Sequence, residues 1–325
     1  MNNKEIIRIL SPRVVEDLHR PHHTLDALAL SASIICFALL VTLLAILPFG
    51  FLWMLCLIAQ GFAIQILGLV KHDLFMHRQW GGPKWSYIGE LVLGLPLTSP
   101  PTAVKVTHMQ HHFSVNTDED TEAYKQDLDS LWKRWIFLTA PGVALAMGRL
   151  FASRKTRGYL DIEKTVTPKI AQKIRFEKKL LLGYFIFISI LVLYWPQFIF
   201  FGYILPMLIS APIASTFRTI LEHFEVNPEN PIHLATYYKT GRFSRLLFFW
   251  DSGDCHLIHH LFPRLPWYRM KQALEVMHPI LMDAGVIERK NFWLLAKEWL
   301  IKGHPHRSLL TEAPESPKLI LSVSR

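Results

Sequence analysis

Four long stretches of this chain carry almost no charge. Residues 25–47 contain one charged side chain, Asp26, at an edge, and residues 51–70, 180–195 and 198–217 contain none. Each stretch is near the ~20 apolar residues that a helix needs to cross the ~30 Å hydrocarbon core of a membrane, although the third is short. Only 19% of the residues are charged, against about 25% in soluble domains. These features predict an all-α integral membrane protein with four transmembrane helices.

The distribution of basic residues predicts how these helices are arranged. Brief connections at residues 48–50 and 196–197 would join the four helices into two hairpins. All 35 lysines and arginines lie outside the two hairpins, in the N-terminal, middle and C-terminal segments. With four crossings these three segments share one side, which the positive-inside rule assigns to the cytoplasm. We therefore expect both termini in the cytoplasm, at a bacterial inner membrane or the endoplasmic reticulum.

The formal charge of +9 has the same explanation, since basic residues scattered around membrane spans suit anionic headgroups and argue against a nucleic-acid partner. Two shorter apolar runs, 87–98 and 136–147, are too short to span, and we expect them to lie in the membrane interface or to dip partway into the membrane. Amphipathic segments at 162–179 and 268–277 are expected to form a cytosolic helical cap. We predict a single domain over 1–325, with a disordered tail at about 308–325, and no disulfide framework from the three cysteines.

Nine of the sixteen histidines lie just outside the apolar blocks. Eight of them form an H-x4-H pair and two H-x2-H-H triplets, and the ninth follows the last block. Imidazole is the commonest side-chain ligand of transition metals. Nine exceed what one zinc ion, satisfied by four ligands, could use, so the count favours two metal ions. The predicted ligands are His72, His77, His108, His111, His112, His223, His256, His259 and His260.

Helical geometry indicates how these histidines could meet. A rise of ~1.5 Å per residue places those that follow the second and fourth blocks at a similar depth, just beyond the bilayer. Spacings of i, i+3 and i+4 put each triplet on one helix face. His72 and His77 would diverge by about 140° on an α-helix, which predicts ligands of different metal ions or a helix that ends between them.

Carboxylates are expected to orient these imidazoles through their second ring nitrogen. Asp73 adjoins His72, Glu222 adjoins His223, and Asp254 precedes His256 by two residues. These three are the predicted second layer of the site. Residues 118–120, all acidic, follow the first triplet and could act in the same way. No catalytic residue beyond the metal ligands is predicted.

This pattern resembles the three histidine boxes of the membrane fatty acid desaturase and hydroxylase superfamily. The segment 256–268, with its His-His-Leu-Phe-Pro and later Pro-Trp-Tyr, is especially similar to the third box, and Glu222-His223 after Arg218 matches a histidine behind the last span. The resemblance runs from about His72 to His278. It implies a cytosolic di-iron centre that uses O₂ and external electrons to attack an unactivated C–H bond of a lipid or acyl chain taken from the bilayer.

Departures from the family pattern restrict this expectation. No His-Pro-Gly-Gly motif and no C-x2-C pair occurs, so electrons are expected from a separate donor of ferredoxin or cytochrome b5 type. The third box begins with His256 instead of the Gln of front-end desaturases. Desaturation of a fatty acyl chain is the leading prediction. Hydroxylation or ketolation of a lipid or carotenoid is the alternative, followed by a catalytically idle metal- or lipid-binding adaptor. A zinc peptidase is disfavoured because H-E-x-x-H is absent.

Overall fold

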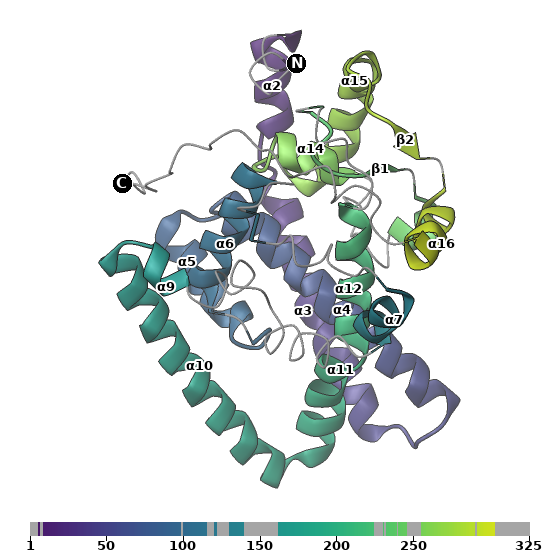
Figure 1. Cartoon of the computed structure of the whole chain (residues 1–325). Helices are drawn as coiled ribbons and strands as arrows, with labels where there is room; N and C mark the ends of the chain where they lie inside the picture. The colour runs from purple at the N-terminus through teal and green to yellow at the C-terminus, as the bar shows by residue number, and fades with distance from the viewer. Residues whose placement is uncertain are drawn as a thin grey trace.

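The computed structural model describes residues 6, 9–98, 100–115, 120–121, 130–139, 162–223, 230, 232–238, 240–245, 255–289 and 291–302. These residues are mainly helical (Figure 1). The short N-terminal helix α2 (Pro12–His19) begins at Ser11, whose hydroxyl accepts a hydrogen bond from the amide of Val14, as helix-capping serines commonly do. The chain then enters the first apolar hairpin.

The first hairpin consists of α3 (His23–Ile46) and α4 (Phe51–Lys71). The two helices pack side by side over much of their length (Figure 1), and they coincide with the predicted spans 25–47 and 51–70. Two of the three helical stretches that are long and apolar enough to cross a membrane lie here, Pro12–Ile46 and Phe51–His77. A six-residue π-helix, η1 (His72–His77), continues α4 without a break.

The second hairpin differs from the prediction in its first arm. Its second arm runs through η4 (Gln197–Ile204), α11 (Leu205–Leu208) and α12 (Ser210–Glu222), and the stretch Gln197–Ser215 is the third candidate span. Its first arm, α10 (Pro168–Tyr194), becomes apolar only after Lys178 and Lys179. The apolar remainder is shorter than the ~20 residues that a crossing needs. Among the described residues, three candidate spans are found where four were predicted.

Small residues allow the helices of the two hairpins to approach closely. A Cβ added to Gly61 of α4 would come within 2.5 Å of Ser210, and one added to Gly202 would come within 2.8 Å of Val41 on α3. The Ser210 hydroxyl donates to the carbonyl of Leu57 at 2.8 Å. Small residues and interhelical hydrogen bonds are the usual means of packing helices in a membrane. The hairpins therefore form one bundle, with η4 lying against α3.

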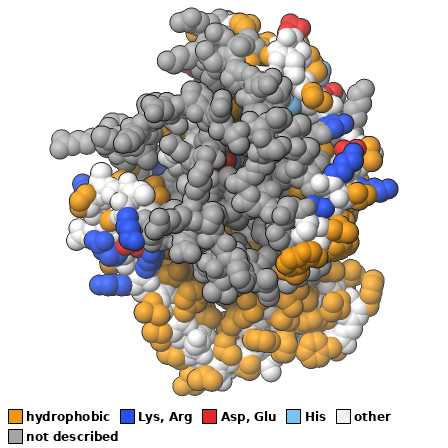
Figure 2. Space-filling view, viewed as in Figure 1, with side chains coloured by type: hydrophobic (Ala, Val, Ile, Leu, Met, Phe, Trp, Pro, Cys, Tyr) orange, Lys and Arg blue, Asp and Glu red, His pale blue; other side chains and the backbone are white. Residues whose placement is uncertain are grey.

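Figure 2 shows hydrophobic side chains gathered at one end of the molecule, with most lysines and arginines above them. The hairpin tips belong to this apolar end: Phe49 and Phe51 are 73% and 81% exposed, and Leu193 is 80% exposed. Exposed apolar side chains on this scale mark a surface that is covered by a partner or a membrane.

The opposite end holds shorter elements. They are α5 (Pro83–Gly94), α6 (Pro101–Ser114), α7 (Leu131–Thr139), α9 (Ile162–Thr165), α13 (Arg242–Ser244), α14 (His256–Leu261), η7 (Trp267–Arg269), α15 (Met270–Asp283) and α16 (Phe292–Lys302), with the parallel two-residue strands β1 (Tyr237–Tyr238) and β2 (Glu288–Arg289). The amphipathic segments predicted at 162–179 and 268–277 fall in α9, α10, η7 and α15. Of the apolar run 136–147 only the part within α7 is described, and the tail at 308–325 lies outside the described residues.

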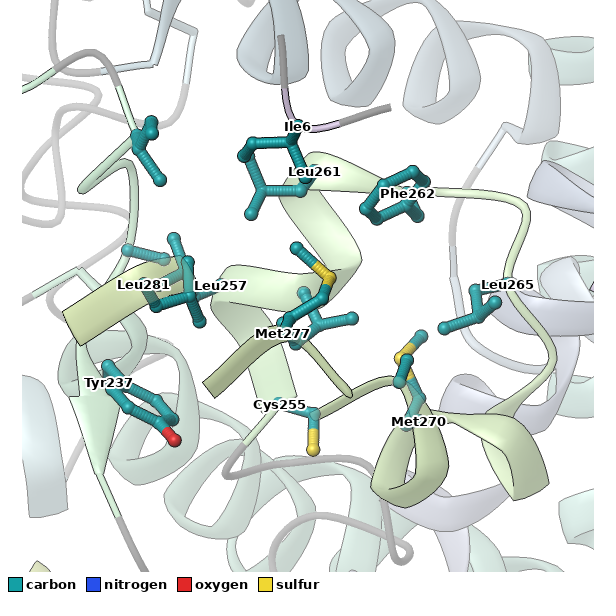
Figure 3. Close-up of a cluster of buried hydrophobic side chains, with 14 of the residues drawn as sticks. Ile6, Tyr237, Cys255, Leu257, Leu261, Phe262, Leu265, Met270, Met277 and Leu281 are labelled. Atoms are coloured by element: carbon teal, nitrogen blue, oxygen red, sulfur yellow. The ribbon is translucent and has the colours of Figure 1, made fainter. Parts of the chain in front are cut away.

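A hydrophobic cluster fixes the position of α14 at this end (Figure 3). Leu257 and Leu261 of α14 pack with Met270, Met277 and other buried side chains of α15. Leu257 and Met277 are fully buried. Because one face of this short helix is held in the cluster, its remaining side chains keep a fixed direction.

Candidate metal centre

The structure gathers the nine predicted histidines at one place, in two sets of four with one between them. In each set the ligand nitrogens all lie within 4.8 Å of one another. We call His72, His77, His108 and His259 the cavity group, and His111, His223, His256 and His260 the inner group. The ninth, His112, has its Nε2 3.0 Å from that of His108 and its ring centroid 4.4 Å from that of His260.

The π-helix η1 explains why His72 and His77 lie in the same group. Their Nε2 atoms are 3.1 Å apart, although five residues separate them. A π-helix bonds residue i to i+5, which brings such residues onto one face, and π-turns occur frequently at functional sites. The expectation of divergent side chains assumed α-helical geometry and was wrong for this reason.

Helix α6 supplies ligands to both groups. His108 points to the cavity group, with its Nε2 2.8 Å from that of His72. His111, one turn further, points to the inner group, with its Nε2 3.1 Å from that of His223. The rings of His108 and His111 are tilted by only 35° with centroids 5.9 Å apart. One helical face thus spans the two groups.

Helices α12 and α14 complete the inner group. His223 is the residue that ends α12, and its Nε2 lies 3.1 Å from that of His256 at the start of α14. His260, one turn later on α14, has its Nε2 3.1 Å from that of His256. His259 on the same short helix turns to the cavity group.

The spacing of these nitrogens fits a cation better than hydrogen bonding. In the cavity group, the Nε2 atoms of His72, His77 and His108 form a triangle with sides of 2.8, 3.1 and 3.1 Å. Three neutral imidazoles carry only one ring proton each, and three that converge on one centre leave lone pairs directed at it. The converging nitrogens could therefore hold one cation between them.

Carboxylates orient two histidines of the inner group. Nδ1 of His111 lies 2.7 Å from Oδ1 of Asp120, and both side chains are buried. Nδ1 of His256 lies 3.2 Å from Oε1 of Glu222, which also pairs with Arg218 at 2.5 Å. Such contacts fix the ring orientation and raise the basicity of the nitrogen facing the metal. Glu222 therefore contacts a histidine distant in sequence, and Nδ1 of its neighbour His223 lies 3.2 Å from the carbonyl oxygen of Leu234.

Asp73 contacts an arginine. Arg78 donates to Asp73 at 2.9 Å and to Asp26 of α3 at 2.5 Å, and Asp26 is fully buried. Burial alone would lower the pKa of Arg78, but its hydrogen bond to Asp26 and the charges of both carboxylates raise it. This ion triad ties η1, which carries His72 and His77, to α3.

The contact of Arg78 with Asp26 was not among the predictions from the sequence. It was indicated there by Asp26, the lone charge in an apolar block, because a charged residue in such a position usually has a partner. Asp254, the third predicted carboxylate, lies outside the described residues.

Burial keeps the described imidazoles of α14 neutral. The pKa values of His256, His259 and His260 lie well below the ordinary value for histidine, first because these side chains are desolvated and then because other histidines surround them. Neutral imidazole is the form that binds metals. These three imidazoles are therefore in the form that can bind a metal ion.

A small cavity of about 30 Å³ adjoins the histidines. Its lining residues are Leu69, His72, Asp73, Arg218, His256, His259, Trp267 and Met270. Leu69 belongs to the candidate span Phe51–His77, so one wall of the cavity is the end of α4 that leads into η1. The cavity gives a small molecule a place beside both groups.

The fold and the site together define a membrane protein with two adjoining histidine groups that could each hold a metal ion. Comparison with known families agrees with this class. The sequence pattern of the fatty acid desaturase family matches residues 52–291, which include all nine histidines. The chain belongs to the fatty acid desaturase family, a family of membrane oxidoreductases.

The chain is also similar to one characterised enzyme over a short segment. It shares 54% identity over 35 residues with the Delta(12) acyl-lipid conjugase (11E,13E-forming) of Impatiens balsamina. That segment is 11% of this chain and 9% of the conjugase, so the similarity is local.

Proposed function

We propose that this protein is an O₂-dependent desaturase of acyl chains in lipids, with a di-iron centre held by its nine histidines. The observation that carries the proposal is the pair of adjoining imidazole groups, with nitrogen spacings near 3.1 Å, at the end of an apolar bundle. The family and the acyl-lipid substrate named for the similar plant enzyme support the same substrate class.

The nine histidines divide naturally between two irons. The cavity group with His112 would hold one iron, and the inner group would hold the other. All of these side chains would offer imidazole nitrogens, which iron accepts as ligands. When bound, the irons would supply the O₂ chemistry that removes hydrogen from an unactivated C–H bond.

The protein's own residues would control that chemistry by position and by exclusion of water. Asp120 and Glu222 would hold the rings of His111 and His256 in register and offset the positive charge of the metal. The ligands of α14 are buried, and a dry surrounding strengthens these electrostatic contacts. The acyl chain would lie along the apolar side of the bundle, with its reactive carbon in the cavity beside His72 and His259.

We also propose a fourth membrane crossing. The apolar part of α10, residues 180–194, extends to the same apolar end of the molecule as the hairpin of α3 and α4 (Figures 1 and 2). Ile186 and Leu193 on it are 56% and 80% exposed, as lipid-facing side chains are. With four crossings and the positive-inside rule, both termini and the histidines would lie in the cytoplasm. The electrons would come from a separate ferredoxin or cytochrome b5 type donor.

The test is a mass-resolved lipid profile of cells that express the chain, compared with cells that express His259→Ala. Lipid species lacking two hydrogens in the first cells alone would support the proposal and identify the acyl chain. Lipid species that gain one oxygen would instead indicate that the protein is a hydroxylase.

Host compatibility is controlled by supplying purified protein with a reductase, a donor of each type and acyl-lipid vesicles. Two bound irons without O₂ consumption under all these conditions would overturn the proposal in favour of an idle metal-binding protein.

A further inference from the structure

Helices α7 and α16 each expose large apolar side chains, which is unusual for a water-facing surface. On α16, Trp293 is 55%, Leu294 52% and Ile301 60% exposed. Together with the exposed Lys297, they follow at i, i+1, i+4 and i+8. At 100° per residue these positions cover only about 100° of the helix surface. They therefore form one stripe.

The opposite face of α16 is also apolar and is buried in the protein. Its members are Phe292, Leu295, Ala296 and Trp299, all 7% exposed or less. A helix that is hydrophobic on both sides is normally covered on both. The exposed stripe therefore suits an apolar surrounding better than water.

Helix α7 repeats this arrangement. Leu131 is 50%, Trp132 54% and Trp135 49% exposed. Between them, Arg134 is buried and donates at 2.9 Å to the carbonyl oxygens of Leu300 and Ile301 in the last turn of α16. A charged donor on these terminal carbonyls joins the two helices. They form one unit, which we call the tryptophan collar (α7 and α16).

The position of the collar identifies its partner. Both helices pack against α12, which continues the candidate span ending at Ser215. From Ser215 to Glu222, where α12 ends, the helix rises about 10 Å. The collar therefore lies within roughly the thickness of the headgroup layer beyond the hydrocarbon core.

We propose that the tryptophan collar lies in the lipid headgroup layer on the side of the histidine site, with its stripe of Trp and Leu side chains in the membrane. Tryptophan is enriched at this depth because its ring is apolar and its N–H is polar. Lys297 and the exposed Lys302 can extend toward anionic headgroups. Helix α16 lies beyond the family match at residues 52–291, so family membership does not assign it this role.

The consequence is mechanical. The collar holds α12 at a fixed depth, and α12 carries Glu222 and leads into His223. Membrane attachment at this point would keep the inner group level with the acyl chains that reach the cavity.

The test measures the depth of single reporters in the full-length protein, reconstituted in phosphatidylcholine nanodiscs. A fluorescent NBD group is attached at Leu294→Cys in a Cys36→Ser background, since the other two cysteines are buried. Lipids that carry a spin-label quencher high or low on the acyl chain report depth. Leu39→Cys on α3, 56% exposed, is the deep control. Glu275→Cys, at an exposed position on α15, is the aqueous control, because Figure 1 shows α15 at the end of the molecule opposite the hairpin tips.

We expect the reporter at residue 294 to be quenched at least about twice as strongly by the shallow label as by the deep one. The Leu39 reporter should be quenched more strongly by the deep label than by the shallow one, and the Glu275 reporter should be quenched by neither label. Should Leu294→Cys fail to fold, Ile301→Cys takes its place. An unquenched, water-like reporter at both positions would overturn the proposal. An unquenched reporter whose emission shifts with protein concentration would overturn it in favour of a second copy of the chain. Neither reporter depends on activity, so this result is separate from that of the desaturase assay.

Discussion

The two histidine groups differ in what surrounds their imidazoles. All four histidines of the inner group are buried, at 7% exposure or less. The outer nitrogens of three of them, His111, His256 and His223, contact Asp120, Glu222 and the carbonyl oxygen of Leu234, respectively. In the cavity group, His72 and His108 are only partly buried, and the carboxylate beside His72 is engaged by Arg78. Two members of the cavity group, His72 and His259, line the cavity, whereas the inner group contributes one lining residue, His256.

This difference suggests a division of labour between two groups built from the same ligand. The inner group is fixed by charged partners, which compensate a metal's charge and restrict its geometry. The cavity group is more accessible, and it lies where a small molecule or an acyl carbon can approach. The imidazoles of the inner group would then retain a metal ion, and those of the cavity group would hold a metal ion that contacts the reactants.

Removal of one ligand from each group should have the largest effect. We expect His259→Ala and His260→Ala each to lower the rate of product formation by more than about 100-fold, because loss of a ligand exceeds the 10–100-fold effect of losing its supporting partner. Each variant should also lose about one of two irons per chain. His278→Ala is the matched control, since that histidine bonds Tyr237 outside both groups.

Product formation and iron per chain are measured on the same purified samples. Normal turnover and two irons in either alanine variant would remove that histidine from the site. If both irons are lost from His259→Ala but only one from His260→Ala, the inner group depends on the cavity group, contrary to the division above.

Loss of the supporting carboxylates should have a smaller effect, confined to the inner group. Glu222→Gln and Asp120→Asn should each weaken binding of one iron by roughly 10–100-fold, because the ring of His256 or His111 would lose its anionic partner. Competition with a chelator measures the affinity of each iron separately. Asp283→Asn, at an exposed position on α15, is the control.

Weakening of both irons to the same extent would show that the carboxylates support the whole centre and not one group. Unchanged affinity would reduce Glu222 and Asp120 to structural roles.

The sequence predicted which histidines come together better than it predicted the groups that contact them. The i, i+3, i+4 spacing of His108, His111 and His112 is a local property of an α-helix, and it places one face across both groups, as the structure shows. The meeting of His72 and His77 depends on a π-helix, which is rare and is not indicated by α-helical spacing. The contact of Glu222 with His256 depends on the packing of α12 near α14. It could not be predicted by pairing each carboxylate with the histidine next to it in the sequence.

For the membrane helices too, the sequence predicted what depends on local composition and not what depends on the surroundings. Composition located α3, α4 and the arm that contains Gln197–Ser215 because each is long and uncharged. It could not settle α10, whose apolar part is short and follows two lysines. Whether such a helix crosses a bilayer depends on its neighbours and on the lipid around it.

The smallest expected effect concerns α6, the helix that both groups share. Glu177 of α10 is fully buried and accepts hydrogen bonds from the backbone N–H of Thr102 at 2.8 Å and from its hydroxyl at 2.5 Å. These contacts cap the first turn of α6. Removing a helix cap costs about 0.5–2 kcal/mol, so Glu177→Ala should lower the unfolding temperature of the metal-free protein, and Glu177→Gln, which keeps one acceptor oxygen, should lower it less.

Because α6 carries His108 and His111, this variant should weaken both irons equally, unlike the carboxylate variants. Thermal unfolding in detergent and the chelator competition measure the two effects together. Glu163→Gln, which removes an exposed partner of Lys178, is the control. A selective loss of one iron would mean that α6 is held independently near each group, and the contrast between the groups would then extend into the helix that joins them.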